Sequence, residues 1–154
     1  MIQRIQSLYL SLSVMLTTLL LYGKIVSFVT EDGNVLEMRY NGLFEMVGSA
    51  AGRAEHLLPL TLLLIIVPIL LFVTLLLYKF RKLQLRAAVM SLLLLIGLTI
   101  LVAYYIFYVS TAYDATVVFS IKVVFPPVAA VLTYLAFRGI LRDELLIRSY
   151  ERLR

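Results

Sequence analysis

Four long apolar stretches, separated by short charged segments, constrain the fold of this chain more than any other feature. They comprise residues 5–22, 57–78, 87–109 and 117–137, and Lys122 is the only charged residue in them. A helix rises about 1.5 Å per residue, so roughly 20 apolar residues can cross a hydrocarbon core about 30 Å thick. The sequence therefore predicts four transmembrane helices, of which the first is barely long enough.

The composition agrees with a membrane protein. Hydrophobic residues make up 62% of the 154 residues, which leaves too little polar surface for a water-soluble globule. The longest segment outside the stretches, residues 23–56, is too short for an independent core. We expect one four-helix transmembrane domain over residues 1–154. With no cysteine, the chain has no disulfide, thiolate nucleophile or cysteine-based metal site.

The distribution of Lys and Arg predicts the orientation. Ten of the fourteen precede the first stretch, lie in the loop 79–86 or lie in the tail 138–154. The positive-inside rule then places both termini and that loop in the cytoplasm, and residues 23–56 outside. The expected location is the inner (cytoplasmic) membrane of a bacterium. No small-residue cleavage site follows the first stretch, so we expect an uncleaved helix and no signal peptide.

The outer loop contains the one strand-like pattern. Residues 26–30 and 35–40 are rich in β-branched and apolar side chains, and they flank a Glu-Asp-Gly-Asn segment that favours a tight turn. This predicts a β-hairpin whose apolar face packs on the helix ends, the lipid interface or a partner. We expect residues 43–47 to form an interfacial helical turn and residues 48–52 to be flexible.

Polar and helix-breaking residues within the stretches favour structural roles. Lys122 lies near the outer end of its stretch, so we expect its amine to reach the headgroups, close to Asp114. Pro68 and the pair Pro126–Pro127 predict kinks inside the second and fourth helices.

Small and hydroxyl side chains predict where helices pack together. Such residues let backbones approach closely and can form hydrogen bonds between helices. We expect packing on a face of the first helix and at two positions of the third: Ser7, Ser11, Thr18, Ser91 and Gly97.

No residue pattern predicts catalysis. The chain has a single histidine, His56, and no carboxylate within the four stretches. A metal-ligand spacing, a glycine-rich phosphate loop and a nucleophile motif are absent from the sequence. We expect a protein that is not an enzyme and that has no metal or cofactor.

The cytoplasmic segments carry the most specific pattern. The loop 79–86 places four cations in eight residues, enough to attract anionic headgroups, and the tail 138–154 predicts a helix with one apolar and one basic face. The candidate docking residues are Arg4, Arg81, Lys82, Arg86, Arg142, Leu146, Arg148, Tyr150, Arg152 and Leu153. Expected partners are the bilayer, with anionic phospholipid at this face, and another membrane protein or complex, but no nucleic acid.

Three segments of the sequence resemble a known family. They are residues 1–6 (MIQRIQ), residues 81–86 (RKxQxR) and residues 136–154 (AxRxIxxDExxxRSxxRLR). They resemble a family of small four-helix membrane proteins of Bacteroidota-type bacteria, catalogued as a domain of unknown function. The resemblance covers nearly the whole chain and implies an inner-membrane protein, but it brings no activity, ligand or site.

The sequence therefore predicts an all-α membrane protein with a small outer loop and a cytoplasmic C-terminal helix. The expected function is an accessory or scaffold subunit with a basic cytoplasmic docking rim. One alternative is a small transporter or channel-like carrier that uses the proline-kinked helices and Lys122. Another is a regulator that binds anionic lipid.

Overall fold

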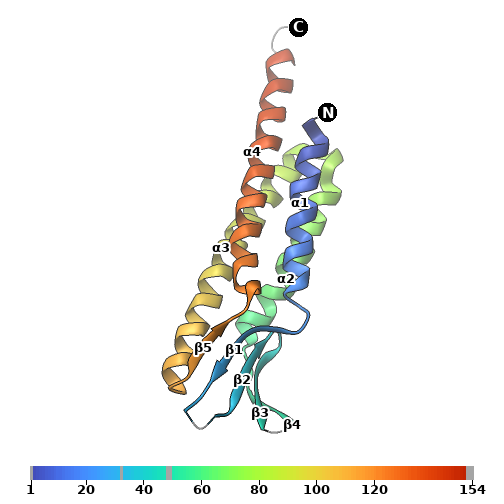
Figure 1. The fold of residues 1–154 in the computed structure, drawn as a ribbon. Coiled ribbons are helices and arrows are strands. Elements are labelled where there is room, and N and C mark those ends of the chain that lie inside the picture. The colour runs from blue at the N-terminus through green and yellow to red at the C-terminus, as the bar shows by residue number, and fades with distance from the viewer. Residues whose placement is uncertain (1, 32, 48–49, 152–154) are drawn as a thin grey trace.

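Four helices lie side by side, and a β-sheet covers one end of them (Figure 1). The computed structural model describes residues 2–31, 33–47 and 50–151. The helices are α1 (Ile2–Leu19), α2 (Leu58–Leu76), α3 (Arg81–Ala112) and α4 (Phe125–Glu151), with short 3-10 helices η1 (Leu77–Lys79) and η2 (Ile121–Val124). The helix α1 packs on α2 and α4, and α3 packs on the same two helices, so the four form a closed bundle.

The two ends of the bundle differ. The start of α1, the connection from α2 to α3 and the end of α4 lie together, and we call this the terminal end (Figure 1). The opposite end carries the strands, and we call it the sheet end. Because the helices run alternately up and down, segments far apart in the sequence meet at each end.

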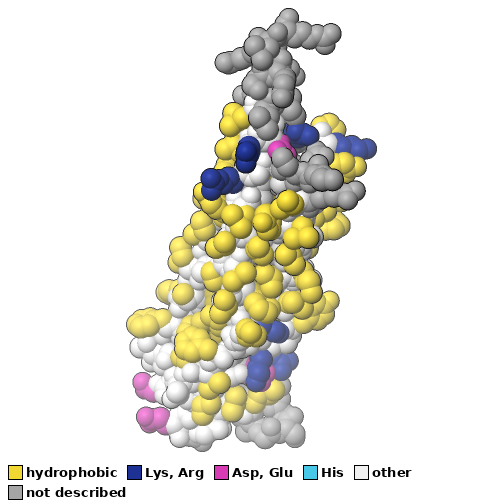
Figure 2. All heavy atoms as spheres, turned by 45° about the horizontal axis from the view of Figure 1, so that its top comes forward, with side chains coloured by type: hydrophobic (Ala, Val, Ile, Leu, Met, Phe, Trp, Pro, Cys, Tyr) yellow, Lys and Arg dark blue, Asp and Glu magenta, His cyan; other side chains and the backbone are white. Residues whose placement is uncertain are grey.

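Three helices are long and apolar enough to cross a membrane: Leu58–Lys79, Arg81–Ala112 and Ile121–Leu145. The described apolar part of α1, Ile5–Leu19, is shorter. Hydrophobic side chains cover the middle of the face in Figure 2, with Lys and Arg beyond them towards both ends. Such a wide apolar surface is not stable in water and requires lipid. The protein is therefore a mostly helical membrane protein with three membrane-spanning candidates.

The sheet has five strands in the order β4-β3-β2-β1-β5, and every neighbouring pair is antiparallel. They are β1 (Lys24–Val29), β2 (Val35–Arg39), β3 (Gly42–Val47), β4 (Ala50–Glu55) and β5 (Thr116–Phe119). The predicted hairpin is confirmed as β1 and β2. The predicted helical turn at 43–47 is wrong, because those residues form β3. The all-α prediction was thus incomplete, since residues 23–56 contribute four of the five strands.

The predicted fourth span is also wrong in its bounds. Residues 117–137 form one apolar run, but the structure divides it into β5, η2 and the start of α4. Strand β5 pairs with β1, with Phe28 opposite Val117. Apolar strands and apolar helices have the same composition, so composition alone could not separate them.

The proline positions explain where α4 begins. Pro126 and Pro127 lie in the first turn of α4, where a missing backbone N–H removes no intrahelical hydrogen bond. The predicted kink at this pair is therefore wrong, whereas Pro68 does lie inside α2. From Phe125 the helix continues without a break through the predicted tail to Glu151.

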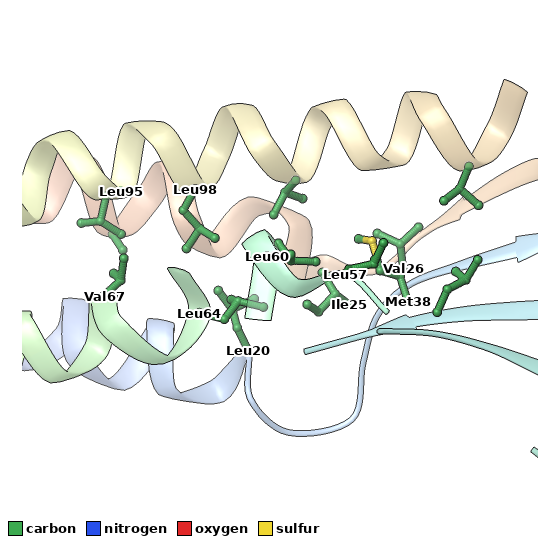
Figure 3. Close-up of a cluster of buried hydrophobic side chains, with 14 of the residues drawn as sticks. Leu20, Ile25, Val26, Met38, Leu57, Leu60, Leu64, Val67, Leu95 and Leu98 are labelled. Atoms are coloured by element: carbon green, nitrogen blue, oxygen red, sulfur yellow. The ribbon is translucent and has the colours of Figure 1, made fainter. Parts of the chain in front are cut away.

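One hydrophobic core joins the sheet to the helices (Figure 3). Ile25, Val26 and Met38 of the sheet are fully buried, as are Leu60 and Leu64 on one face of α2. Burying such a side chain from water contributes about 1.5–3 kcal/mol. The apolar face of the hairpin therefore packs on the helix ends. The sequence had left the lipid interface and a partner protein open as alternatives.

Hydroxyl groups join helices inside the bundle, although not where we expected most of them. Ser13 Oγ lies 3.2 Å from Thr133 Oγ1 and 3.2 Å from the carbonyl oxygen of Ala129, between α1 and α4. Thr74 and Ser91 join α2 to α3 at 3.3 Å between their oxygens. Of the residues predicted for helix packing, Ser91 is confirmed in this role.

Three of the other predicted packing positions, Ser11, Thr18 and Gly97, do not join helices in this way. Ser11 and Thr18 donate to carbonyls of their own helix, at Leu8 and Val14. A Cβ added at Gly97 would have no neighbour within 4 Å, so this glycine is not a point of close helix approach.

Candidate functional site at the terminal end

A cavity of about 320 Å³ opens at the terminal end, between α1, the start of α3 and α4. Its lining is polar on several sides, and comprises Gln6, Ser7, Tyr78, Arg81, Gln84, Ile140 and Asp143. Each of the three segments that carried the family resemblance contributes to this lining. The cavity is therefore the place where those distant segments meet.

Gln6 of α1 is held against α4. Its side chain is 7% exposed, and its Nε2 donates a hydrogen bond of 2.7 Å to Oδ2 of Asp143. Gly139 makes this approach possible, since a Cβ added there would lie 2.8 Å from Cγ of Gln6. A buried amide that donates to a carboxylate fixes both groups in place. The wall formed by α1 and α4 is thus a defined polar surface.

The first turn of α3 forms the facing wall. The helix begins at Arg81 after Phe80, which provides no side-chain cap, and no acidic residue lies in its first turn. Gln84 lies one turn later and is 7% exposed. Its backbone N–H donates to the carbonyl of Phe80 at 2.9 Å. Its side-chain amide lines the cavity, and it is not among the fully buried polar atoms of the described residues that lack a partner, so it is open to the cavity.

The cavity keeps two opposite charges apart. Arg81 and Asp143 both line it and both are half-buried. Among residues 2–31, 33–47 and 50–151, the recorded ion pairs do not include either of them. A cation and an anion that share a small cavity without contact can receive a ligand that carries both charges.

The structure brings few of the predicted docking residues together. Arg81 lines the cavity, whereas Lys82, Arg86 and Arg142 are exposed outside it. Four others lie in α1 or α4 with side chains outside the described part, namely Arg4, Leu146, Arg148 and Tyr150. Arg152 and Leu153 lie outside the described residues.

Sequence reasoning missed the polar lining itself. Gln6, Gln84 and Asp143 stood in the recognised segments, yet we assigned them no role. The signal that could have found them is a glutamine within an apolar helix at headgroup depth, because an amide there requires a polar partner. Their convergence depends on how the helices are rotated, which the sequence alone does not show.

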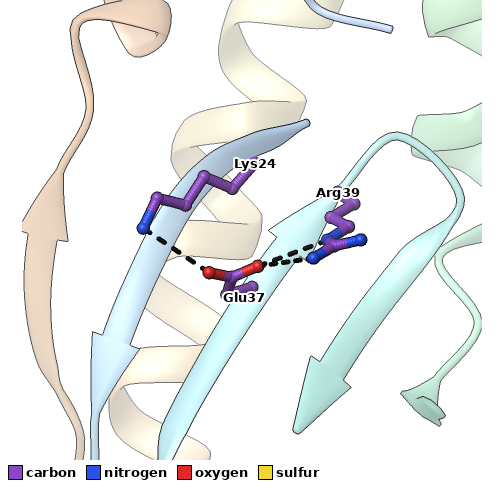
Figure 4. A network of polar contacts seen from close by, with 3 residues as sticks. All are labelled: Lys24, Glu37 and Arg39. Atoms are coloured by element: carbon purple, nitrogen blue, oxygen red, sulfur yellow. Dashed lines mark hydrogen bonds and ion pairs between the residues drawn. The ribbon is translucent and has the colours of Figure 1, made fainter. Parts of the chain in front are cut away.

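The sheet end has a polar network of a different kind (Figure 4). Glu37 of β2 accepts hydrogen bonds from Nη2 and Nε of Arg39 at 2.9 Å and 3.3 Å, and its other oxygen lies 3.5 Å from Nζ of Lys24. The hydrogen bond from Arg39 holds the pKa of Glu37 below its ordinary value, although burial acts in the opposite direction. Every charge in this network has a partner, so it joins β1 to β2.

Lys122 also has a structural partner. Its amine donates to the backbone carbonyl of Tyr22, which follows the end of α1. The predicted approach to Asp114 is wrong, since no ion pair between them is recorded in the described part of the chain. The side chain connects η2 to the turn after α1.

Among the described residues, no group of three His, Asp or Glu residues has an arrangement that could hold a metal ion.

Comparison with known proteins gives a family and no activity. No curated protein matches the chain. A family model matches residues 2–153, which is almost the entire sequence and includes the three segments on which the resemblance rested except for residues 1 and 154. That match confirms the resemblance, and the chain belongs to the family described as a domain of unknown function (DUF4293).

Proposed function

We propose that this protein is an accessory or scaffold subunit of the inner membrane, with four membrane crossings and a cytoplasmic terminal end that docks another protein. It carries out no catalysis of its own in this proposal. The support comes from the fourth helix, from the position of the first helix and from the distribution of basic residues.

The observation that carries the proposal is the length of α4. This helix continues from its apolar part to Glu151 and extends past the start of α1 at the terminal end (Figure 1). Towards this end of α4, Arg142 is exposed and Leu145 is 58% exposed. A helix that extends beyond its bundle with apolar and basic side chains can dock in a groove of a partner.

Packing supports α1 as a fourth crossing. It lies against α2 and α4, both of which have membrane-spanning length. Its outward side chains are apolar, with Ile5, Leu8 and Met15 each more than half exposed. Such a surface beside two candidate spans supports the proposal that α1 lies in the same lipid. With four crossings, the basic asymmetry supports a cytoplasmic terminal end.

The carrier alternative has less support. A groove of about 510 Å³ beside α3 and α4 is lined mainly by apolar side chains such as Val102, Ile106 and Pro127. A path for a polar solute requires polar groups at this depth. Lys122, the cation that the carrier would use, already donates to the carbonyl of Tyr22.

The test is co-purification from native membranes in mild detergent. Replacing Leu146, Tyr150 and Leu153 by Ser should release a partner protein and leave the bundle inserted, since apolar side chains dominate docking of a helix. The matched control replaces Val29, Tyr40 and Val118, which are exposed apolar residues of the sheet end, by Ser. Loss of the same protein from both variants, or from neither, would contradict docking at the terminal end.

A reporter fusion tests the orientation separately. A reporter that is active only in the cytoplasm should be active after Arg154 and inactive when it is inserted in the loop between β1 and β2. The reverse activities would contradict the side that we assign to the terminal end.

A further inference from the structure

Gln84 is the group that the docking proposal leaves unexplained. Its side chain is 7% exposed and lines the cavity at the terminal end, and no partner for its amide is recorded in the described residues. Among the described residues, the only fully buried side-chain polar atom without a partner is Oδ1 of Asn41, so the amide of Gln84 is open to the cavity that it lines. A polar ligand in the cavity can therefore form a hydrogen bond with it. The amide can both donate and accept a hydrogen bond, so it selects a polar ligand but not the sign of the ligand's charge.

The wall formed by α3 favours an anionic group. Arg81 is the first residue of the helix, and the N–H groups of the first turn have no side-chain cap. The N-terminus of a helix carries partial positive charge and binds phosphate, and a guanidinium matches phosphate oxygens in pairs. Gln84 lies at the next turn of the same wall and can donate to the same anion. Arg81 and Gln84 therefore offer donors to an anion from the same wall of the cavity, at the positive end of α3.

The opposite wall favours a cation. Asp143 of α4 uses Oδ2 to accept the hydrogen bond from Gln6, and the described part of the chain records no ion pair for its carboxylate. A carboxylate that is half-buried attracts a cation with N–H donors. Arg81 does not satisfy it, although both residues line the same cavity. A ligand with an ammonium group can supply such a cation.

The depth of the cavity indicates a lipid. It lies where the apolar part of α2 ends, and Tyr78, an aromatic residue at that boundary, forms part of its lining. Tyrosine is enriched at the level of the headgroups in membrane proteins. Exposed apolar side chains of α2, among them Phe72 and Leu76, continue from there toward the bilayer interior and can contact acyl chains.

We propose that this cavity binds the headgroup of an ethanolamine phospholipid, with the phosphate at Arg81 and Gln84 and the ammonium at Asp143. A choline headgroup carries the same charges but has no N–H to donate to the carboxylate. A glycerol headgroup has the phosphate but no cation. The docking test replaces Leu146, Tyr150 and Leu153, which follow Asp143 along α4 and are not among the residues of this site, so either proposal can fail while the other holds.

Lipid binding to the full-length protein in detergent, measured by native mass spectrometry, tests the proposal. The three probes are phosphatidylethanolamine, phosphatidylcholine and phosphatidylglycerol with identical acyl chains. We expect the ethanolamine lipid to bind about tenfold tighter than the choline lipid, which corresponds to one charge-assisted hydrogen bond. Equal affinities, or tighter binding of the glycerol lipid, would overturn the assignment.

Variants separate the two halves of the site. Asp143→Asn should abolish the preference for ethanolamine over choline, and it should fold, because the Asn oxygen can still accept the Gln6 hydrogen bond. Arg81→Gln should weaken all three lipids about tenfold. The matched control is Arg86→Gln, since Arg86 lies on the same helix but is exposed outside the cavity. A preference that persists in Asp143→Asn would overturn the proposed role of the carboxylate.

A fourth variant tests the unpaired amide, and a soluble probe tests whether the ligand is a lipid. Gln84→Met keeps the size of the side chain and removes its donors, so we expect weaker binding of every phospholipid and no loss of folding. Thermal unfolding of each variant without lipid verifies the fold. Free phosphoethanolamine should compete poorly with the lipid. If it competed as well as the lipid, the site would belong to a soluble ligand and the proposal would be wrong.

Discussion

The two ends of the bundle use charge in opposite ways. At the sheet end, Glu37 has partners on both oxygens, and the amine of Lys122 is used by a backbone carbonyl. At the terminal end, Arg81 and Asp143 share a cavity without an ion pair recorded in the described part of the chain, beside a buried Gln84. Paired charges contribute to the fold, whereas separated charges remain available to bind. The contrast fits a structural role for the charges of the sheet end and the binding site that we propose at the terminal end.

The largest effect is expected at a turn of the sheet. Gly42 has φ +144°, and a Cβ added there would lie 2.5 Å from the carbonyl oxygen of Glu55. Gly42→Ala should therefore destabilise the protein by about 3 kcal/mol, through strain and the clash with rigid backbone. Thermal unfolding in detergent measures this. The control is Gly33→Ala, where φ is +78° but nothing lies within 4 Å, and it should cost about 1 kcal/mol. Equal costs would show that the close contact is unimportant.

At the terminal end, Gly139→Ala should cost about 1–2 kcal/mol, since the added Cβ displaces Gln6. The double variant Gln6→Ala, Gly139→Ala should recover part of this loss. Gly97→Ala serves as the control, because nothing lies within 4 Å of that position in α3, and it should be neutral or slightly stabilising. If the two glycine variants unfolded at the same temperature, Gly139 would have no special role in placing Gln6.

The ion-pair network makes the sheet end sensitive to acid. The pKa of Glu37 is lowered from its ordinary value of 4.5, so the unfolded chain takes up a proton before the folded chain does. Its stabilisation is therefore present above pH 4.5 and is lost as the pH falls through the folded pKa. Glu37→Gln should cost about 1 kcal/mol at neutral pH and nothing once the carboxyl is protonated.

Unfolding temperatures from pH 7 to pH 3 measure this difference. Glu31→Gln is the control, because Glu31 is exposed and the described residues record no ion pair for it. A constant difference between the wild type and Glu37→Gln across the pH range would mean that the charge of Glu37 does not stabilise the sheet.

The smallest effect is expected in the middle of the bundle. Thr133→Val removes the hydroxyl that donates to Ser13 and preserves the shape of the side chain. Hydrogen bonds between membrane helices contribute about 0.6 kcal/mol, so a loss of this size is expected. Thr99→Val is the control, since Thr99 donates only to Leu95 of its own helix. A loss above about 2 kcal/mol would mean that the hydrogen bond between Thr133 and Ser13 stabilises the protein more than the Glu37 network does.

Local patterns predicted some parts of this structure and not others. The hairpin of β1 and β2 followed from alternation around a Gly-Asn turn, and the helices α2 and α3 followed from apolar length. Strand β5 could not be found, because its pairing with β1 is long-range and its residues are as apolar as the helix after it. The basic segments at the terminal end were visible in the sequence. The cavity was not, since the approach of Gln6 to Asp143 depends on the missing side chain at Gly139.

The pairing of β1 with β5 can form only late in synthesis. Strand β1 ends at Val29, but its partner begins at Thr116, close to ninety residues later. At a translation rate of about 5–20 residues per second, the edge of β1 that pairs with β5 stays unpaired for roughly 4–18 s. An open edge can pair with the wrong chain during that interval. The nascent protein is therefore most exposed to misassembly from the synthesis of β1, after the first helix, until β5 emerges after the third helix.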